Sequence, residues 1–381
     1  MRITSTLSLY LAKRYALNLF ILLFALLAII YLFDTVELIR RASKYDIPLS
    51  LILQMGILKL PEVGQTLFPF AILFSAMFTF WQLTRRYELI VVRASGFSIW
   101  QFLSPIIFVG ILLGVLHMTV INPIGAVFIS KFEDLERTYL KREKNQIAVF
   151  QEGLWLRQPV LIQAETSLLE AEIKPQNLVS GYVILHAKKI EQPDWVLKDI
   201  TALYFKDNNE FLQRIDAKSA TLDNQSWHMR DVIIHKKDNQ KAKEQTYVLP
   251  TTLTANDIEE SFSSPESMSF WKLPAYIKTL EQTGFDASRL KVHYHSLLSQ
   301  PLMFTAMILL AAAVSMRPPR SKGTFLMIVA GIFIGFMIFF FSSFLQALGA
   351  SQQIPVSLAA WSPALISFLL GLSVMMNMED G

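Results

Sequence analysis

The stretch ALNLFILLFALLAIIYLF, from Ala16 to Phe33, decides the class of this protein, because it carries no charged residue over its whole length. Lys13 and Arg14 precede it. A cleaved signal peptide is the competing interpretation. However, the stretch is long for a signal peptide, and it ends in Phe33-Asp34-Thr35 without a small-residue cleavage site. It therefore predicts an uncleaved membrane helix, which needs about 20 apolar residues.

Five more apolar runs of similar length follow along the chain. They cover residues 57–83, 99–121, 297–316, 325–348 and 356–376. Charged residues make up only 17% of the 381 residues, against roughly 25% in a soluble domain. The sequence thus predicts an α-helical membrane protein with about six transmembrane helices.

A long polar segment separates the third run from the fourth. Apolar and polar residues alternate in residues 148–157, 182–186 and 195–200, as expected of strands. Residues 214–234 read as two strands around an Asp-Asn-Gln-Ser turn at 223–226. We predict a β-sandwich or β-jelly roll inserted between helices 3 and 4. The expected divisions are 1–130, 131–270 and 271–381, with helical character at 131–144 and 272–290.

Basic residues in the short connecting segments predict the orientation in the membrane. They gather in three segments that fall on one side: Arg2, Lys13 and Arg14; Arg85, Arg86 and Arg93; Arg317, Arg320 and Lys322. That side is expected to be cytoplasmic, with both termini there and the polar insertion outside, in the periplasm. This pattern also accounts for the net charge of +4, so we expect no nucleic acid as a partner.

One segment opposes the orientation rule. Arg40, Arg41 and Lys44 follow the first helix and must lie outside. The segment is either an ordinary solvated loop or an anion-binding site at the outer membrane surface.

Motifs of catalysis are missing from the sequence. It has no G-x-x-x-x-G-K-[ST], no H-E-x-x-H and no G-x-S-x-G. Cysteine is absent, and His293 and His295 have no third ligand near them in the sequence. We expect no enzymatic activity, no metal and no cofactor.

The segment RRYELIVVRASG, Arg85 to Gly96, lies between helices 2 and 3 on the expected cytoplasmic side. Leu89, Val92 and Arg93 follow helical spacing, Gly96 suits a helix C-cap and Ser98 suits the next N-cap. It is either an interfacial helix in the head groups or a short helix held by a cytoplasmic partner, with Glu88 as a charged contact.

Several motifs resemble the LptF/LptG family of lipopolysaccharide export permeases. They are Leu60-Pro61, Phe68-Pro69, Arg86-Tyr-Glu88 through Arg93-Ala-Ser-Gly96, and Gln151-Glu-Gly-Leu-Trp155. Residues 267–269, 276–280, 284–289 and 301–302 look more like the LptG branch than the LptF branch. The resemblance covers nearly the whole chain.

The resemblance implies the permease half of an ABC exporter in the bacterial inner membrane. Its partners would be a homologous LptF-like permease, a cytoplasmic LptB-like ATPase dimer that binds the ATP, and periplasmic LptA-like and LptC-like jelly-roll proteins. Residues 85–95 would form the coupling helix, with Arg86, Glu88, Arg93 and Gly96 as its coupling residues.

Lipopolysaccharide would be the substrate, extracted from the inner membrane and passed to a periplasmic bridge. Its phosphates give a reason for cations outside, so the expected contacts are Arg40, Arg41, Lys44, Lys59, Lys131 and Arg137. Lys59 has a second interpretation, a snorkelling lysine paired with Glu62.

Large apolar side chains are expected to line the acyl-chain path: Phe68, Phe333, Phe336 and Phe340. Alternatively, these phenylalanines face lipid or pack between helices. Gly331 and Gly335 are four residues apart, which suits close helix contact.

Three rival functions have distinct signatures. A membrane-anchored periplasmic scaffold would need no ATPase. A lipoprotein-releasing or macrolide-efflux permease would carry its insertion after the first helix, whereas here it follows the third. A proton-coupled transporter would need a chain of buried carboxylates, which the membrane segments lack.

Overall fold

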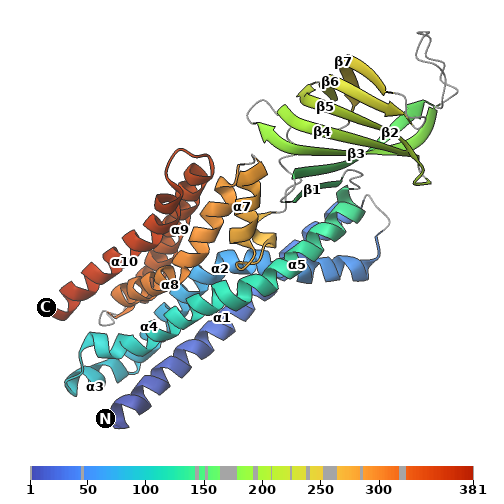
Figure 1. Ribbon diagram of the computed structural model, residues 1–381. Coiled ribbons are helices and arrows are strands. Elements are labelled where there is room, and N and C mark those ends of the chain that lie inside the picture. Colours follow the sequence, from blue (N-terminus) through green and yellow to red (C-terminus); the bar gives the residue numbers. More distant parts are fainter. Residues whose placement is uncertain are drawn as a thin grey trace. The chain divides into compact units, whose positions relative to one another are not determined.

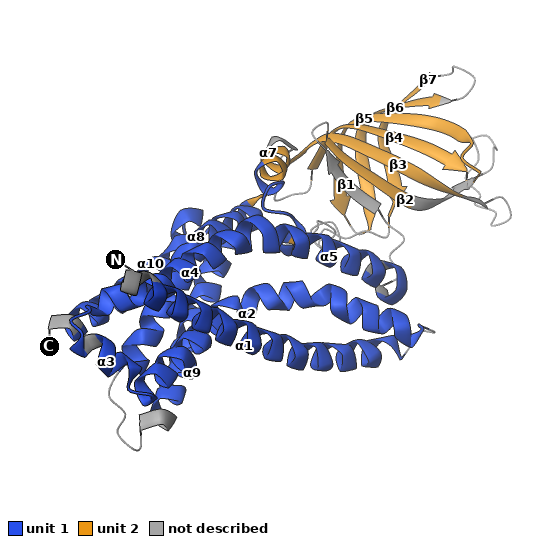
Figure 2. Ribbon diagram, turned by 90° about the horizontal axis from the view of Figure 1, so that it is seen from below, with its two compact units in different colours: residues 1–141, 265–274, 288–381 blue, residues 142–264, 275–287 orange. Residues whose placement is uncertain are grey.

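The computed structural model describes residues 2–43, 47–141, 146–150, 153–163, 178–191, 196–206, 208–223, 225–236, 241–251, 264–283, 286–316 and 323–380. The chain forms two compact units (Figure 2). The helical unit comprises residues 1–141, 265–274 and 288–381, and the β unit comprises residues 142–264 and 275–287. The division after Lys141 reflects a helix that continues through residues 131–141, as its charged helical spacing predicted.

Long helices make up the first unit (Figure 1). They are α1 (Arg2–Ala42), α2 (Leu49–Arg85), α4 (Ile99–Leu116), α5 (Asn122–Leu135), α8 (Ser288–Ser315), α9 (Gly323–Ala350) and α10 (Val356–Asp380). The π-helical turns η1 (His117–Ile121) and η2 (Glu136–Lys141) join α4 to α5 and extend α5. Within the described residues, six helical spans are long and apolar enough to cross a membrane, which confirms the predicted number.

The core of the helical unit lies around α2 and α8. Phe80 and Phe304 are almost completely buried there. In the most apolar stretch of each span, 56% of α2 and 72% of α8 are buried within the chain, against 6% of α1 and 11% of α9. Helices α1 and α9 therefore present most of their apolar surface to the outside of the unit.

Glycines let the helices of this unit approach closely. A Cβ atom on Gly114 of α4 would lie 2.4 Å from the Cα atom of Pro301 in α8. On α9, a Cβ at Gly335 would lie 3.1 Å from a ring carbon of Phe70, and a Cβ at Gly331 would lie 2.4 Å from the Met77 Cε. The prediction that Gly331 and Gly335 permit close helix contact is confirmed, with α2 as the partner helix.

The β unit holds a seven-stranded antiparallel sheet in which each strand pairs with the next. Its strands are β1 (Gln146–Phe150), β2 (Gly153–Gln163), β3 (Leu178–Glu191), β4 (Val196–Lys206), β5 (Phe211–Asp223), β6 (Ser226–Lys236) and β7 (Lys241–Pro250). The inserted β domain is confirmed, and so is the turn between Asp223 and Ser226. The strand order is that of a meander, which is simpler than the Greek-key connections of a strict jelly roll.

The sheet curls so that its ends approach across the inner face. The Gln158 Nε2 of β2 donates to the Pro250 carbonyl at the end of β7, at 3.1 Å. The hydroxyls of Tyr204 in β4 and Tyr247 in β7 lie 3.3 Å apart. Burial, with Tyr247 beside it, raises the pKa of Tyr204 above its ordinary value, so the phenol stays neutral. Trp227 fills the interior and is fully buried.

Short elements connect these parts. They are α3 (Glu88–Ala94), the 3-10 turn η4 (Pro265–Ser267) and α7 (Leu273–Thr283). The segment after the sheet is fixed to the helical unit by Asn122, which is fully buried. The Asn122 Oδ1 accepts from the backbone N–H of Phe270 at 2.8 Å, and its Nδ2 donates to the Gln65 Oε1 at 3.1 Å.

Candidate functional site

The short helix predicted within residues 85–95 exists as α3, Glu88–Ala94. Gly96 follows it with φ +82°, and the Phe97 N–H reaches back to the Val92 carbonyl at 3.4 Å, the long bond of a Schellman cap. Ser98 then begins α4 with a complete capping box to Gln101. Both predicted caps are confirmed, and together they hold α3 as a separate, sharply bounded helix.

A polar cluster ties α3 to α1 and α2. The Arg14 guanidinium of α1 lies 3.3 Å from Glu88 and donates to the Gln82 Oε1 of α2 at 3.2 Å. The Tyr10 hydroxyl donates to the other Glu88 oxygen at 3.0 Å, and Arg14 also contacts Tyr10. Only 14% of the Arg14 side chain is exposed, so water screens this pair weakly. Glu88 was expected to be a contact for a partner, but here it is also a link inside the chain.

The outer surface of α3 remains available. Tyr87, Ile90 and Val91 are each more than half exposed, whereas Leu89 is buried against the helical core. Arg86 is also exposed, at the turn that ends α2. The side chain of Arg93 lies outside the described residues. Tyr87, which precedes α3, and Ile90 and Val91 of α3 form an exposed apolar surface with Arg86 at its edge.

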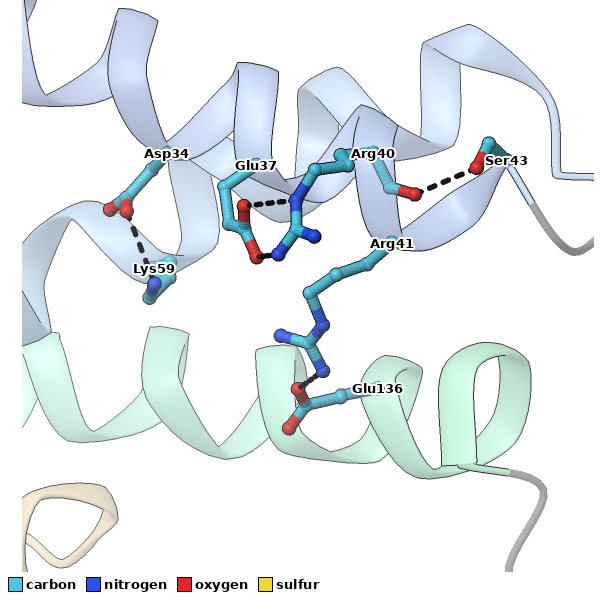
Figure 3. Close-up of polar contacts among 7 residues, drawn as sticks. All are labelled: Asp34, Glu37, Arg40, Arg41, Ser43, Lys59 and Glu136. Carbon is cyan, nitrogen blue, oxygen red and sulfur yellow. Dashed lines mark hydrogen bonds and ion pairs between the residues drawn. The ribbon is translucent and has the colours of Figure 1, made fainter.

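The opposite end of α1 carries the cations expected to bind phosphate (Figure 3). Arg40 pairs with Glu37 at 2.7 Å, on the same helix. Arg41 pairs with Glu136 of η2 at 2.6 Å. Lys59 of α2 pairs with Asp34 of α1 at 3.2 Å, so the alternative interpretation, a Lys59–Glu62 pair, is wrong. Each of the three cations thus has a carboxylate partner in this structure.

These cations differ in how accessible they are. The exposed fraction of the side chain is 74% for Arg40, 38% for Arg41 and 25% for Lys59. An exposed ion pair contributes little net stability, so its cation is easily diverted to another anion. Lys131 is exposed on α5. Lys44 and the side chain of Arg137 lie outside the described residues.

Phenylalanines of α9 form an exposed row. Phe333, Phe336 and Phe340 are 61%, 55% and 59% exposed. Phe336 stacks on Phe340, and Phe340 on Phe344, each with ring centroids 6.4 Å apart. The row makes one continuous apolar strip along the helix.

Phe68 differs from these residues. It is buried, with its ring 4.9 Å from that of His117 and stacked on Phe304 at 6.2 Å. It therefore packs inside the unit, and the structure does not bring it to the exposed row of α9.

Sequence reasoning missed several polar partners of the candidate site residues. Tyr10 and Arg14 stand four residues apart on one helix, and Glu37 and Arg40 stand three apart, which are spacings that place side chains together. That signal was available. Glu136 is 95 residues from Arg41 and Asp34 is 25 from Lys59, and no local pattern connects such pairs.

Comparisons with known proteins agree over the whole chain. The family model described as "Lipopolysaccharide export system permease LptF/LptG" matches residues 9–377. The "Lipopolysaccharide export system permease protein LptG" of Escherichia coli K12 is 23% identical over 97% of both chains. The protein of the same name from Haemophilus influenzae Rd is 24% identical over 96% of this chain and 97% of its own length.

Proposed function

Since the chain belongs to the LptF/LptG family of lipopolysaccharide export permeases, we propose that it is the permease subunit of an ABC transporter. The transporter extracts lipopolysaccharide from the inner membrane and passes it to a periplasmic bridge toward the outer membrane. The protein is a multi-pass inner-membrane protein. The observation that supports this role best is the exposed phenylalanine row of α9.

In this proposal α3 and both termini are cytoplasmic, and the β unit lies in the periplasm. The basic residues near the start of α1 and around α3 support this orientation, because cytoplasmic segments of membrane proteins are enriched in lysine and arginine. The charged end that holds Arg40, Arg41 and Lys59 then faces the outer leaflet, from which the substrate comes.

α3 acts as the coupling helix. Its exposed side chains Tyr87, Ile90 and Val91 dock on one subunit of an LptB-like ATPase dimer, which binds and hydrolyses the ATP. Glu88 contributes a charged contact at the edge of that surface. Because Arg14 bonds to the same carboxylate, movement of α3 is transmitted directly to α1.

The acyl chains travel along α1 and α9. Moving acyl chains into water costs about 0.8 kcal/mol per CH₂ group, so a multi-chain glycolipid would lose on the order of tens of kcal/mol. The chains must therefore stay in apolar surroundings throughout. The bare apolar faces of α1 and α9 supply one half of such a path, and a homologous LptF-like permease supplies the other half.

The phosphates bind at the outer end of α1. Arg40 and Arg41 exchange their carboxylate partners for phosphate oxygens, which accept the same charge-assisted, often bidentate hydrogen bonds from a guanidinium. Arg40 exchanges most readily because its pair with Glu37 is the most exposed. The β unit then passes the lipid to LptC-like and LptA-like proteins.

Photo-crosslinking in cells that make lipopolysaccharide tests the proposal. A photoreactive residue is placed at Phe336 on α9, at Arg41, and at Phe108 on α4, which is 67% exposed and serves as the matched control. We expect glycolipid on the protein at Phe336 and Arg41, with much less at Phe108.

Capture at Phe336 should fall when Glu88→Arg separates α3 from the ATPase. Equal capture at Phe108 and Phe336 would show only that the protein sits in lipid. Absence of glycolipid at Phe336 and Arg41, with the protein folded, would overturn the extraction role and favour a periplasmic scaffold.

A further inference from the structure

A partly open cavity of about 330 Å³ with a mixed polar and apolar lining lies among the helices of the helical unit. Side chains of α2, η1, η4, α8, α9 and α10 line it, in the midst of helices long enough to cross the membrane. The main polar lining residues are Glu62, Gln65, His117, Glu266, His293 and Gln300. The proposed transport route along the exposed faces of α1 and α9 uses none of these side chains.

Several buried polar atoms of the lining have no hydrogen-bond partner. Both ring nitrogens of His117 are unpaired, although this residue is only 1% exposed. The His293 Nε2, the Ser296 hydroxyl, the Gln300 Oε1 and the Gln65 Nε2 are unpaired as well. A buried polar group without a partner loses its hydrogen bonds to water and gains none in return, so a cluster of such groups indicates an occupant that bonds to them.

The charge of the lining selects among occupants. Glu62 and Glu266 both contribute to it, and none of the described lining residues is a lysine or an arginine. Lys59 is one helical turn from Glu62, but it is engaged with Asp34. Two half-buried carboxylates that line one site repel each other and repel an anion, whereas a cation offsets both charges.

The rest of the wall is apolar. Phe70 and Phe339 face the cavity with ring centroids 5.6 Å apart, and Met303 and Met307 lie on α8. A compact metal ion would leave this wall bare, and within the described residues no group of three histidine or acidic side chains is placed to hold a metal ion. An occupant with both a cationic head and an apolar body fits both walls.

We propose that the cavity binds a small primary ammonium compound with an apolar body. Glu62 and Glu266 hold the ammonium group, which has three N–H donors, and Gln300 accepts one of its hydrogen bonds. Phe70, Phe339 and the methionines enclose the apolar body. Water fills the remaining volume and bonds to His117, as expected for a polar cavity of this size.

The occupant also touches α9. Ser342 and Gln346 line the cavity, joined by a hydrogen bond of 2.9 Å from the Gln346 Nε2 to the Ser342 hydroxyl. The same helix carries the exposed row Phe336–Phe340–Phe344. Occupancy of the site therefore reaches the helix that presents the phenylalanine row.

Binding of three matched probes to the full-length protein in lipid nanodiscs tests the proposal. The probes are phenethylamine, 2-phenylethanol and 3-phenylpropionate, which share a phenylethyl body, measured by saturation-transfer difference NMR against empty nanodiscs at neutral pH. We expect the amine to bind at least tenfold more tightly than the alcohol or the carboxylate.

A charge-removing double variant and a cavity-filling variant locate the site, with an exposed carboxylate as the control. Glu62→Gln with Glu266→Gln should weaken amine binding at least tenfold, whereas Asp134→Asn, an exposed carboxylate of α5, should leave it unchanged. Ser296→Phe fills the cavity without altering its charge and should abolish binding, so the test survives if the double variant does not fold. Equal binding of amine and alcohol, or amine binding that both variants leave intact, would overturn the proposal. Absence of amine binding would overturn it as well.

Discussion

The two ends of α1 are both charged, and they are built in different ways. At the start of the helix one guanidinium, that of Arg14, serves two acceptors on two other helices, Glu88 at 3.3 Å and Gln82 at 3.2 Å. At the far end each cation faces a carboxylate of its own, as in the Lys59–Asp34 and Arg41–Glu136 pairs. Between the ends, α1 buries little of its apolar surface.

The start of α1 is therefore held by one shared polar cluster. The far end is held by separate ion pairs, each of which can exchange its partner. Loss of the shared donor removes contacts to two helices at once, because the half-buried Gln82 and Glu88 side chains both accept from Arg14. Independent pairs fail one at a time, and the cost of each follows its exposure to solvent. Substitutions at the start of α1 should therefore have large effects, and those at the far end should have graded ones.

Charge reversal at Glu88 should have the largest effect. Glu88→Arg places two guanidiniums together, so we expect about 2–3 kcal/mol of lost stability and at least tenfold less glycolipid captured at Phe336. The exchanged pair Arg14→Glu with Glu88→Arg restores the internal contact. It should recover the thermal unfolding temperature while capture stays low, because the ATPase still meets the wrong charge. Full recovery of capture would mean that Glu88 acts only inside the chain.

Removing the carboxylate of Asp34 should have the next largest effect. Asp34→Asn leaves Lys59 without its charged partner between two membrane helices. Both side chains are about three-quarters buried, so we expect about 1–2 kcal/mol of lost stability, measured by thermal unfolding in detergent. The double variant Asp34→Asn with Lys59→Met removes both charges and should regain most of that loss. Equal stability of the single and double variants would contradict a working ion pair here.

Neutralising Arg41 should have a smaller effect on stability and a clear one on substrate. Arg41→Gln removes a half-buried contact with Glu136 and should cost about 0.5–1 kcal/mol. In the proposed function it also removes a phosphate contact, so capture of glycolipid at Phe336 should fall about threefold to tenfold. Lys218→Gln, an exposed cation of β5 with no proposed role, is the comparison variant. Unchanged capture in Arg41→Gln would remove this residue from the phosphate site.

The sequence predicts the spans and the caps well because both are local. Membrane thickness sets the length of an apolar run, and the helix ends at Gly96 and Ser98 follow from the conformations that these residues favour. The turn at Asp223–Ser226 is equally local. The alternation that marked the strands gives their faces but not their neighbours, so the meander order was out of reach.

The partners of the charged residues depend on how the helices pack, which local sequence does not show. Arg14 and Glu88 are 74 residues apart, and Arg41 and Glu136 are 95 apart. Phe68 and Phe336 are also the same residue type, and each lies within an apolar run, yet Phe68 is buried and Phe336 is exposed. Only the burial of α2 and the exposure of α9 distinguish them.

The smallest effect is expected at Glu37, and it is the sharpest test of exchangeable contacts. Glu37→Gln releases Arg40 from its partner on the same helix. Arg40 is more exposed than Arg41 and Lys59, the other two paired cations at this end. The unfolding temperature should not change measurably. Binding of an anionic lipid, measured with nanodiscs that contain phosphatidylglycerol, should rise about twofold at low salt and lose this gain at high salt. Glu37→Gln with Arg40→Gln should abolish the gain. A gain that persists without Arg40 would place the responsive cation elsewhere, and the far end of α1 would then behave as a connected network like the first.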